Sequence, residues 1–277
     1  DKTNIVDFAR GLIAHGYELV STGGTAGVVA EAGLSVTPVS SVTGFPEMMD
    51  GRVKTLHPSV HAGILARRDR PDDLRSIETH GIGLIDVVVV NLYPFAETAA
   101  DSEATVDSLI EEIDIGGPTL VRAAAKNFIH VVVVVDPDDY KETMAQLKNP
   151  DGFSMGYRLA LAQKAFAHTR SYDDNIASVL ATVEAKVDGL ARRAALSGEL
   201  APDKLVLEAN RQRILRYGEN PHQAGALYTT GGVGFGGAQV VQGKPLSFTN
   251  LLDLDAAARL MLEFDEPAAV VVKHMNP

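Results

Sequence analysis

The sequence predicts an α/β protein in which helices flank a parallel β-sheet. Residues 84–93 and residues 130–135 are continuous apolar runs rich in valine, a pattern typical of central strands that are covered on both faces. Helical patterns separate the two runs, and a further one opens the chain, so helix-like and strand-like segments alternate. This alternation favours a parallel sheet over a β-sandwich.

The first helix is expected at residues 3–15, where apolar residues recur at helical spacing after a Thr3 cap and before Gly16. A strand at 17–21, a glycine turn at 22–25, a short helix to about residue 32 and a strand at 34–39 should follow. Further helices are expected at 72–80, 104–112 and 118–127, with a long helix or helix pair at 154–184.

At 277 residues, the chain has the length of one large or two medium domains. Residues 185–204 lack a clear strand or heptad pattern and are interpreted as a connector, which puts the domains at 1–195 and 196–277. The second domain should contain a glycine-rich part at 205–246, a helix at 249–264 and a strand at 268–273. Because the chain stops directly after that strand, we expect this domain to be incomplete. The absence of an initial Met suggests that the true start lies upstream.

The composition excludes several classes of function. Lys and Arg number 25 against 36 Asp and Glu, a net charge of -11 that disfavours binding to a nucleic-acid backbone. No apolar run approaches the roughly 18 residues of a membrane span. The absence of cysteine excludes disulfides, thiolate zinc sites and a cysteine nucleophile, and fits a reducing compartment such as the cytoplasm.

Two glycine-rich turns are candidate anion sites. Thr22-Gly23-Gly24-Thr25 joins a strand to a helix, and Gly116 and Gly117 precede Pro118, which suits the first position of a helix. Both turns should expose unpaired N–H groups at a helix start. The first turn is equally compatible with a tight connection alone. In the second, Asp114 suits either a base or an ordinary helix cap.

Cationic and aromatic side chains accompany these turns. Arg52 and Lys54 stand two apart in a segment between Gly51 and Pro58, so in an extended conformation they share a face that suits an anion, although a solvated basic edge has the same pattern. Asn91 and Tyr93 end an apolar strand, where ligands collect in open α/β sheets. Tyr93 suits either proton donation or packing.

Lys126 closes the helix that follows Asp114, a position where lysine commonly interacts with the helix dipole. At about 1.5 Å rise per residue, the backbones of Asp114 and Lys126 should lie about 15 Å apart. They can act on the same ligand only if that ligand is long, such as a nucleotide, or if the lysine side chain reaches back along the helix.

No metal site is expected. His57 and His61 have the spacing of zinc ligands on a helix, but Pro58 argues against a regular helix there and no acidic third ligand stands nearby. Motifs of serine hydrolases, P-loop NTPases and zincins are also absent.

The second domain offers Arg216 beside Tyr217, which suits stacking and phosphate contact, and Lys273 beside His274, which suits proton transfer. Each pair is also compatible with a surface loop.

Five motifs in order, GRVKTLHPSVHAG, NLYPF, IDIGGPTLVRAAAKN, LRYGENPHQ and KHMNP, closely resemble the bifunctional AICAR transformylase/IMP cyclohydrolase family of purine biosynthesis. The resemblance implies an N-terminal domain of the methylglyoxal-synthase-like fold that closes formyl-AICAR ribonucleotide into IMP with loss of water and without a cofactor. It implies a second domain, of cytidine-deaminase-like α/β fold, that transfers a formyl group from the cosubstrate 10-formyltetrahydrofolate to AICAR. It also implies a cytoplasmic homodimer with small-molecule nucleotide substrates.

The resemblance assigns residues by motif. Lys54 and Thr55 should lie at the base and formyl group, with Tyr93, Asp114 and Lys126 completing the catalytic set of the cyclohydrolase. The phosphate and ribose side should comprise Lys2, Thr22, Gly23, Gly24, Thr25 and Arg52, and substrate contacts are also expected from Asn91, Gly116, Gly117, Arg216 and Tyr217. Lys273 and His274 should act in formyl transfer.

Two departures accompany the resemblance. Family members place a strand and a serine-bearing turn before the segment that opens this chain, and their transformylase domain continues past Lys273 and His274. We therefore expect no formyl transfer from this chain alone.

The expected residue types suit ring closure. The carboxamide nitrogen has to become nucleophilic while the formyl oxygen is polarised. Asp114 is expected to orient or deprotonate the amide, Lys54 and Tyr93 to stabilise the oxygen, and Lys126 to assist as a cation or proton donor. Two alternatives remain: a nucleotide-binding regulatory module of the same fold without catalysis, and methylglyoxal synthase itself.

Overall fold

The structure is a computed structural model. It describes residues 2–46, 48–92, 95–101, 103–187, 189–192, 207, 209–231 and 234–274. These residues divide into two compact units, within residues 1–196 and 197–277. The expected domain boundary between residues 195 and 196 lies outside the described residues, as do Tyr93 and the last three residues of the KHMNP motif.

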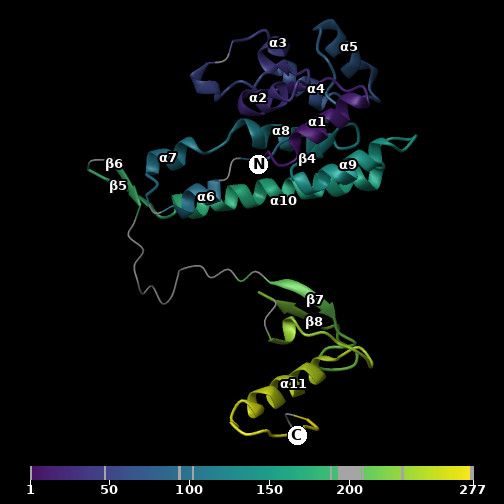
Figure 1. The fold of residues 1–277 in the computed structure, drawn as a ribbon, viewed down its shortest axis with the longest axis vertical. Coiled ribbons are helices and arrows are strands. Elements are labelled where there is room, and N and C mark those ends of the chain that lie inside the picture. Colours follow the sequence, from purple (N-terminus) through teal and green to yellow (C-terminus); the bar gives the residue numbers. More distant parts are fainter. Residues whose placement is uncertain are drawn as a thin grey trace. The chain divides into compact units, whose positions relative to one another are not determined.

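The first unit alternates helices and short strands (Figure 1). Its elements are α1 (Ile5–Ala14), β1 (Val20–Ser21), α2 (Gly23–Glu31), β2 (Thr37–Pro38), α3 (Val39–Thr43), the 3₁₀ helix η1 (Met49–Gly51), α4 (Pro58–Leu65), α5 (Pro71–Thr79), β3 (Val87–Val89), α6 (Phe95–Ala100), α7 (Val106–Glu111), α8 (Gly116–Lys126), β4 (Val132–Val134), the 3₁₀ helix η2 (Pro137–Asp139), α9 (Tyr140–Leu147), α10 (Met155–Leu180), β5 (Val183–Lys186) and β6 (Gly189–Arg192).

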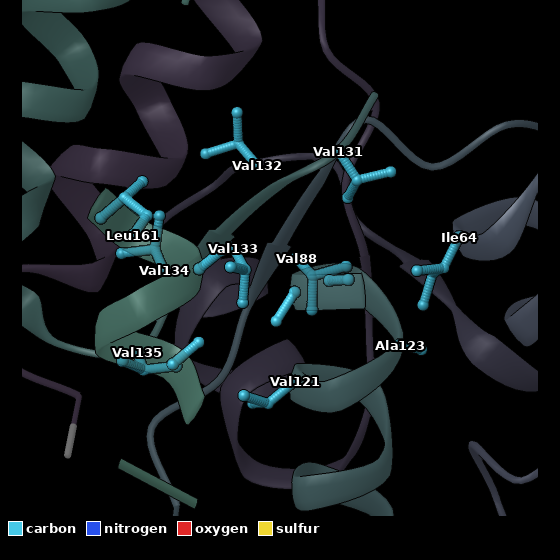
Figure 2. Close-up of a cluster of buried hydrophobic side chains, with 14 of the residues drawn as sticks. Ile64, Val88, Val121, Ala123, Val131, Val132, Val133, Val134, Val135 and Leu161 are labelled. Carbon is cyan, nitrogen blue, oxygen red and sulfur yellow. The ribbon is translucent and has the colours of Figure 1, made fainter. Parts of the chain in front are cut away.

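The core of this unit forms around β3 and β4. The two strands pair in parallel, with Val87 opposite Val132 and Val89 opposite Val134. All five residues of the run 131–135 are at most 4% exposed. Because consecutive strand residues point to opposite faces, both faces of β4 are covered, as its valine run predicts. Figure 2 shows these valines with Val88, Val121 and Leu161, the last two from α8 and α10.

A second parallel pair, β1 with β2, places Val20 opposite Thr37. Among the described residues the parallel strands form these two separate pairs, and not one continuous sheet. The carboxyl end of β1 leads into the turn 22–25, and that of β3 leads into the segment that contains Asn91.

The second unit contains an antiparallel pair, β7 (Asn210–Ile214) and β8 (Ala226–Thr229), the 3₁₀ helix η3 (Gly234–Gly236) and the helix α11 (Phe248–Met261). Ser247 caps α11, and Asn250 completes a capping box with it. The helix expected at 249–264 is thus present.

Several element expectations were wrong. Residues 183–192 include an antiparallel hairpin, β5 with β6, where an irregular connector was expected. Residues 268–273, expected to be a strand, have no strand conformation in the structure, since an apolar run becomes a strand only where a neighbour completes its hydrogen bonds. Pro58 begins α4 instead of preventing it, because the first helical position requires no N–H donor.

Within the described part of the chain, no helix combines the length and apolar character needed to cross a membrane.

Candidate functional site

A cavity of about 310 Å³ lies at the carboxyl ends of the parallel strands β1 and β2. This is the edge at which ligands bind in open parallel sheets. The lining comes from the turn after β1, the segment after β2 and the loop that precedes α4: Ser21, Thr22, Gly23, Ala26, Pro38, Val39, Ser40, Thr43, Phe45, Pro46, Val53, Lys54, Leu56 and His57.

The first glycine turn opens α2 and collects two ammonium groups. Gly23 has a φ of +48°, in the left-handed region that favours glycine. A Cβ atom built on Gly23 would lie 3.3 Å from Lys54 Nζ, and one built on Gly24 would lie 2.8 Å from Lys2 Nζ. No side chain caps the start of α2 at Thr22. Backbone donors, the helix dipole and two lysines therefore combine at one turn, an arrangement that suits a phosphate.

The second glycine turn opens α8 and holds a carboxylate. Asp114 Oδ1 accepts a hydrogen bond from the Gly117 N–H at 2.9 Å. A Cβ atom on Gly117 would collide with the Asp114 carboxylate and would lie 2.9 Å from Leu92 Cδ2, so only glycine fits there. Leu92 follows β3, which brings the end of that strand to the same turn.

The loop that carries Lys54 and Thr55 connects the two turns. Lys54 Nζ lies beside Gly23 in the first turn. Thr55 lies beside the second turn, since a Cβ atom on Gly116 would be 2.6 Å from Thr55 Oγ1. Three segments far apart in the sequence, at 22–25, 52–55 and 114–117, therefore meet in one region. Sequence spacing alone does not reveal this meeting.

Arg52 lies toward the second turn. Its guanidinium pairs with the carboxylate of Glu111, the last residue of α7, and both side chains are more than half exposed. Exposed ion pairs contribute no more than about 1 kcal/mol, so this pair adds little to the stability of the fold.

Asn91 follows β3 and is held by a hydrogen bond to α9. Its Nδ2 donates to the Tyr140 hydroxyl at 3.1 Å, and the Tyr140 ring stacks on Phe8 with centroids 4.2 Å apart. Burial raises the pKa of the Tyr140 hydroxyl, which therefore stays protonated at neutral pH.

Lys126 is the last residue of α8 and is exposed. Since α8 has 11 residues, its ends are about 15 Å apart at 1.5 Å rise per residue. The structure thus separates Lys126 from the turn that holds Asp114, as the spacing predicts. The neighbouring Asn127 is buried and donates to the carbonyls of Ile64 and Ala66.

In the second unit, Arg216 and Tyr217 form one stacked group. The guanidinium lies 4.8 Å from the centre of the Tyr217 ring and donates to its hydroxyl at 3.0 Å. His274 Nδ1 lies 3.8 Å from Asp253 Oδ2 and is mostly exposed. Both pairs offer polar groups for a small molecule.

Sequence reasoning missed Tyr172, which belongs to α10. Its hydroxyl accepts a hydrogen bond from the Asp114 N–H at 2.8 Å and donates one to the Glu112 carbonyl at 3.1 Å. Burial raises its pKa. The sequence shows only a tyrosine within a long helical pattern. It does not reveal the contact, because the hydrogen-bond partners stand about sixty residues earlier in the chain.

Sequence reasoning also missed Ser40, Thr43 and Phe45 as cavity-lining residues. His57, considered earlier as a metal ligand, instead caps α4 by accepting a hydrogen bond from the Ser59 N–H at 3.1 Å. In the described ranges, no three histidine or carboxylate side chains converge as metal ligands would.

Two family models match this chain. The model of the AICARFT/IMPCHase bienzyme matches residues 124–277, and the model of the MGS-like domain matches residues 4–119. Together they account for both units.

Curated relatives match along the whole chain. The bifunctional purine biosynthesis proteins PurH of Cyanothece sp., Pediococcus pentosaceus and Listeria monocytogenes are 49%, 48% and 47% identical to it. Each match covers 100% of this chain, and 53%, 52% and 52% of the respective relative. The chain thus spans about half the length of these proteins. A crystal structure described as ForH is 38% identical, with a TM-score of 0.57 over 65% of this chain and 94% of that one.

Proposed function

Because this chain belongs to the AICARFT/IMPCHase bienzyme family, we propose that its first unit is an IMP cyclohydrolase, which closes formyl-AICAR ribonucleotide into IMP with loss of water. The observation that carries this proposal is the pair Lys54 and Thr55, which extends from the glycine turn at Gly23 to the one at Gly116. A nucleotide has the length to occupy both turns at once. A triose phosphate, the substrate of methylglyoxal synthase, is much shorter.

In this proposal the ribose phosphate binds at the first turn. Lys2 and the residues 22–25 surround the phosphate, and the N–H groups at the start of α2 donate to it. The heterocycle then extends toward the second turn, where Thr55 and Asp114 lie. Arg52 exchanges its exposed partner Glu111 for the ribose or the phosphate.

Asp114 supplies the base. One carboxylate oxygen accepts from Gly117, and the carboxylate orients or deprotonates the carboxamide nitrogen as it attacks the formyl carbon. Tyr93 and Lys54 stabilise the formyl oxygen as it gains negative charge; for this role the Lys54 ammonium has to turn from Gly23, beside which it lies in the structure, toward the heterocycle. That oxygen then leaves as water. Lys126 ends α8, so it has to reach back toward the second turn to assist as a cation or proton donor. None of these steps requires a cofactor.

The second unit is proposed to belong to the AICAR transformylase. Arg216 and Tyr217 suit a nucleotide through phosphate contact and stacking, and Lys273 with His274 suits proton transfer during formyl transfer from 10-formyltetrahydrofolate. We place the boundary between the two enzymatic domains at residues 195 and 196. The proposal further includes a homodimer located in the cytoplasm.

The test of ring closure uses formyl-AICAR ribonucleotide and follows the ultraviolet change of purine formation. The chain should produce IMP, and Lys54→Met should lower the rate at least about 100-fold because a charge at the developing oxyanion is lost. Lys148→Met, which removes an exposed lysine at the end of α9, is the matched control. Full activity of a folded Lys54→Met variant would contradict the assignment.

Nucleotide binding without turnover by the unchanged protein would instead support the regulatory-module alternative. Isothermal titration with IMP, run beside the kinetic assay, separates binding from catalysis.

A further inference from the structure

Tyr172 lies on α10, and its side chain is 7% exposed. Its single hydroxyl accepts a hydrogen bond from the Asp114 N–H and donates one to the Glu112 carbonyl. The short segment between α7 and α8 is therefore fixed at two backbone positions. We propose that Tyr172 is a positioning residue that holds the Asp114 carboxylate in place and thereby sets the rate of ring closure. The inference rests on the proposed function of the first unit.

The Asp114 carboxylate depends on its backbone for its position. In the structure its side chain accepts a hydrogen bond from the Gly117 N–H at 2.9 Å, and the carboxylate occupies the space that a Cβ atom on Gly117 would need. A base has to lie within hydrogen-bond reach of the proton that it removes. A shift of the Asp114 backbone therefore moves the base directly.

The Tyr172 ring is held by packing. It packs with Leu92, Phe95 and Leu109 in a buried cluster and meets the Phe95 ring edge-on, with centroids 6.3 Å apart. This packing fixes the ring and with it the hydroxyl that bonds the backbone on both sides of residue 113.

The test removes the hydroxyl and keeps the ring. Tyr172→Phe should lower kcat for ring closure by about 10- to 100-fold, since displacement of a catalytic group by about 1 Å has effects of this order, while KM changes by less than about threefold because the phosphate turn is untouched. The matched control is Tyr157→Phe on the same helix, whose hydroxyl bonds Thr143 at 2.7 Å. This control should retain kcat within about twofold. Equal losses in both variants, or no loss in Tyr172→Phe, would overturn the proposal.

A double variant distinguishes positioning from a general structural role. If Tyr172 acts through Asp114, Tyr172→Phe should have almost no further effect on kcat in an Asp114→Asn background. Multiplicative losses would show that Tyr172 acts independently of the carboxylate and would refute the proposal.

Amide hydrogen exchange tests the same contact without any turnover. Exchange at residues 113–117 should accelerate about tenfold or more in Tyr172→Phe, because the segment opens locally more often, and should be unchanged in Tyr157→Phe. Unchanged exchange in Tyr172→Phe overturns the positioning role. Accelerated exchange in a protein without ring-closing activity would refute the proposed function while establishing that Tyr172 holds the turn.

Discussion

At the residue scale, Asp114 has a structural role in the turn that opens α8, and the proposed function gives it a chemical role as well. Its carboxylate accepts a hydrogen bond from an N–H in the first turn of α8, as an ordinary helix cap does. The same contact leaves the carboxylate at the second glycine turn, where the proposed mechanism needs a base. The two readings that the sequence leaves open are therefore compatible.

Two substitutions at Asp114 separate these roles. Asp114→Asn should keep the hydrogen bond from Gly117 and change the free energy of unfolding by less than about 0.5 kcal/mol, because Asn and Asp cap helices almost equally well. It should nevertheless lower kcat at least about 100-fold, because an amide is not a base. Asp114→Ala should lose activity and also about 1 kcal/mol of stability. Urea unfolding and the ring-closure assay check both, and an active Asp114→Asn variant would exclude Asp114 as the base.

His168 on α10 should make stability depend on pH. Burial lowers the pKa of its imidazole, the charged Lys164 lowers it further, and the carboxylate of Asp136 partly opposes both. The unfolded chain therefore binds a proton at higher pH than the folded protein does, so stability is present above the unfolded pKa of about 6.5 and falls as the pH drops below it.

The measurement is the free energy of unfolding between pH 7.5 and pH 5. His168→Gln should show a smaller decrease than the unchanged protein, and His61, whose pKa burial also lowers, accounts for part of the remaining slope. Identical slopes in the two proteins would show that His168 contributes nothing to the pH dependence.

At the scale of elements, the strand β4 dominates the core of the first unit. Val134 is fully buried between helices, whereas Val187, at the turn between β5 and β6, is fully exposed. Val134→Ala should lower the free energy of unfolding by about 2 kcal/mol through lost burial and a remaining cavity. Val187→Ala should change it by less than about 0.5 kcal/mol. Urea denaturation measures both, and similar values for the two would contradict the placement of the core.

Helices and strands could be predicted to different degrees. The helix expected at 118–127 is present as α8, and the stretch expected at 154–184 to be one helix or two forms the single helix α10, which ends at Leu180 before β5 begins at Val183, because strong periodicity and caps are local signals. Strand lengths were overestimated: within the described residues 84–92, the strand β3 comprises three residues. Apolar residues mark burial, but a strand requires a paired neighbour, and β4 pairs with β3 over three residues.

At the scale of the whole molecule, the two units differ in how much they bury. In the first unit a large apolar cluster surrounds β3 and β4. Among the described residues of the second unit, one apolar residue, Leu215, is buried. Cooperative unfolding needs a substantial buried core. The first unit should therefore determine the main thermal transition.

Calorimetry tests this expectation. Val134→Ala should lower the temperature of the main transition, Leu215→Ala should leave it unchanged, and IMP at 100 times its Kd should stabilise the folded state by about 2.7 kcal/mol and raise that temperature. A main transition that moves with Leu215→Ala would show that the two units unfold together.

The sequence by itself determined the α/β class, the buried valine strands, the glycine turns and the family, because periodicity, composition and ordered motifs are properties of the chain read in one dimension. Only the tertiary structure decided that Lys54 reaches the turn at Gly23 while Thr55 reaches the turn at Gly116, and that Tyr172 holds the backbone of Asp114. These contacts join residues tens of positions apart. Such distances depend on how helices and strands pack in three dimensions, and local sequence signals carry no information about them.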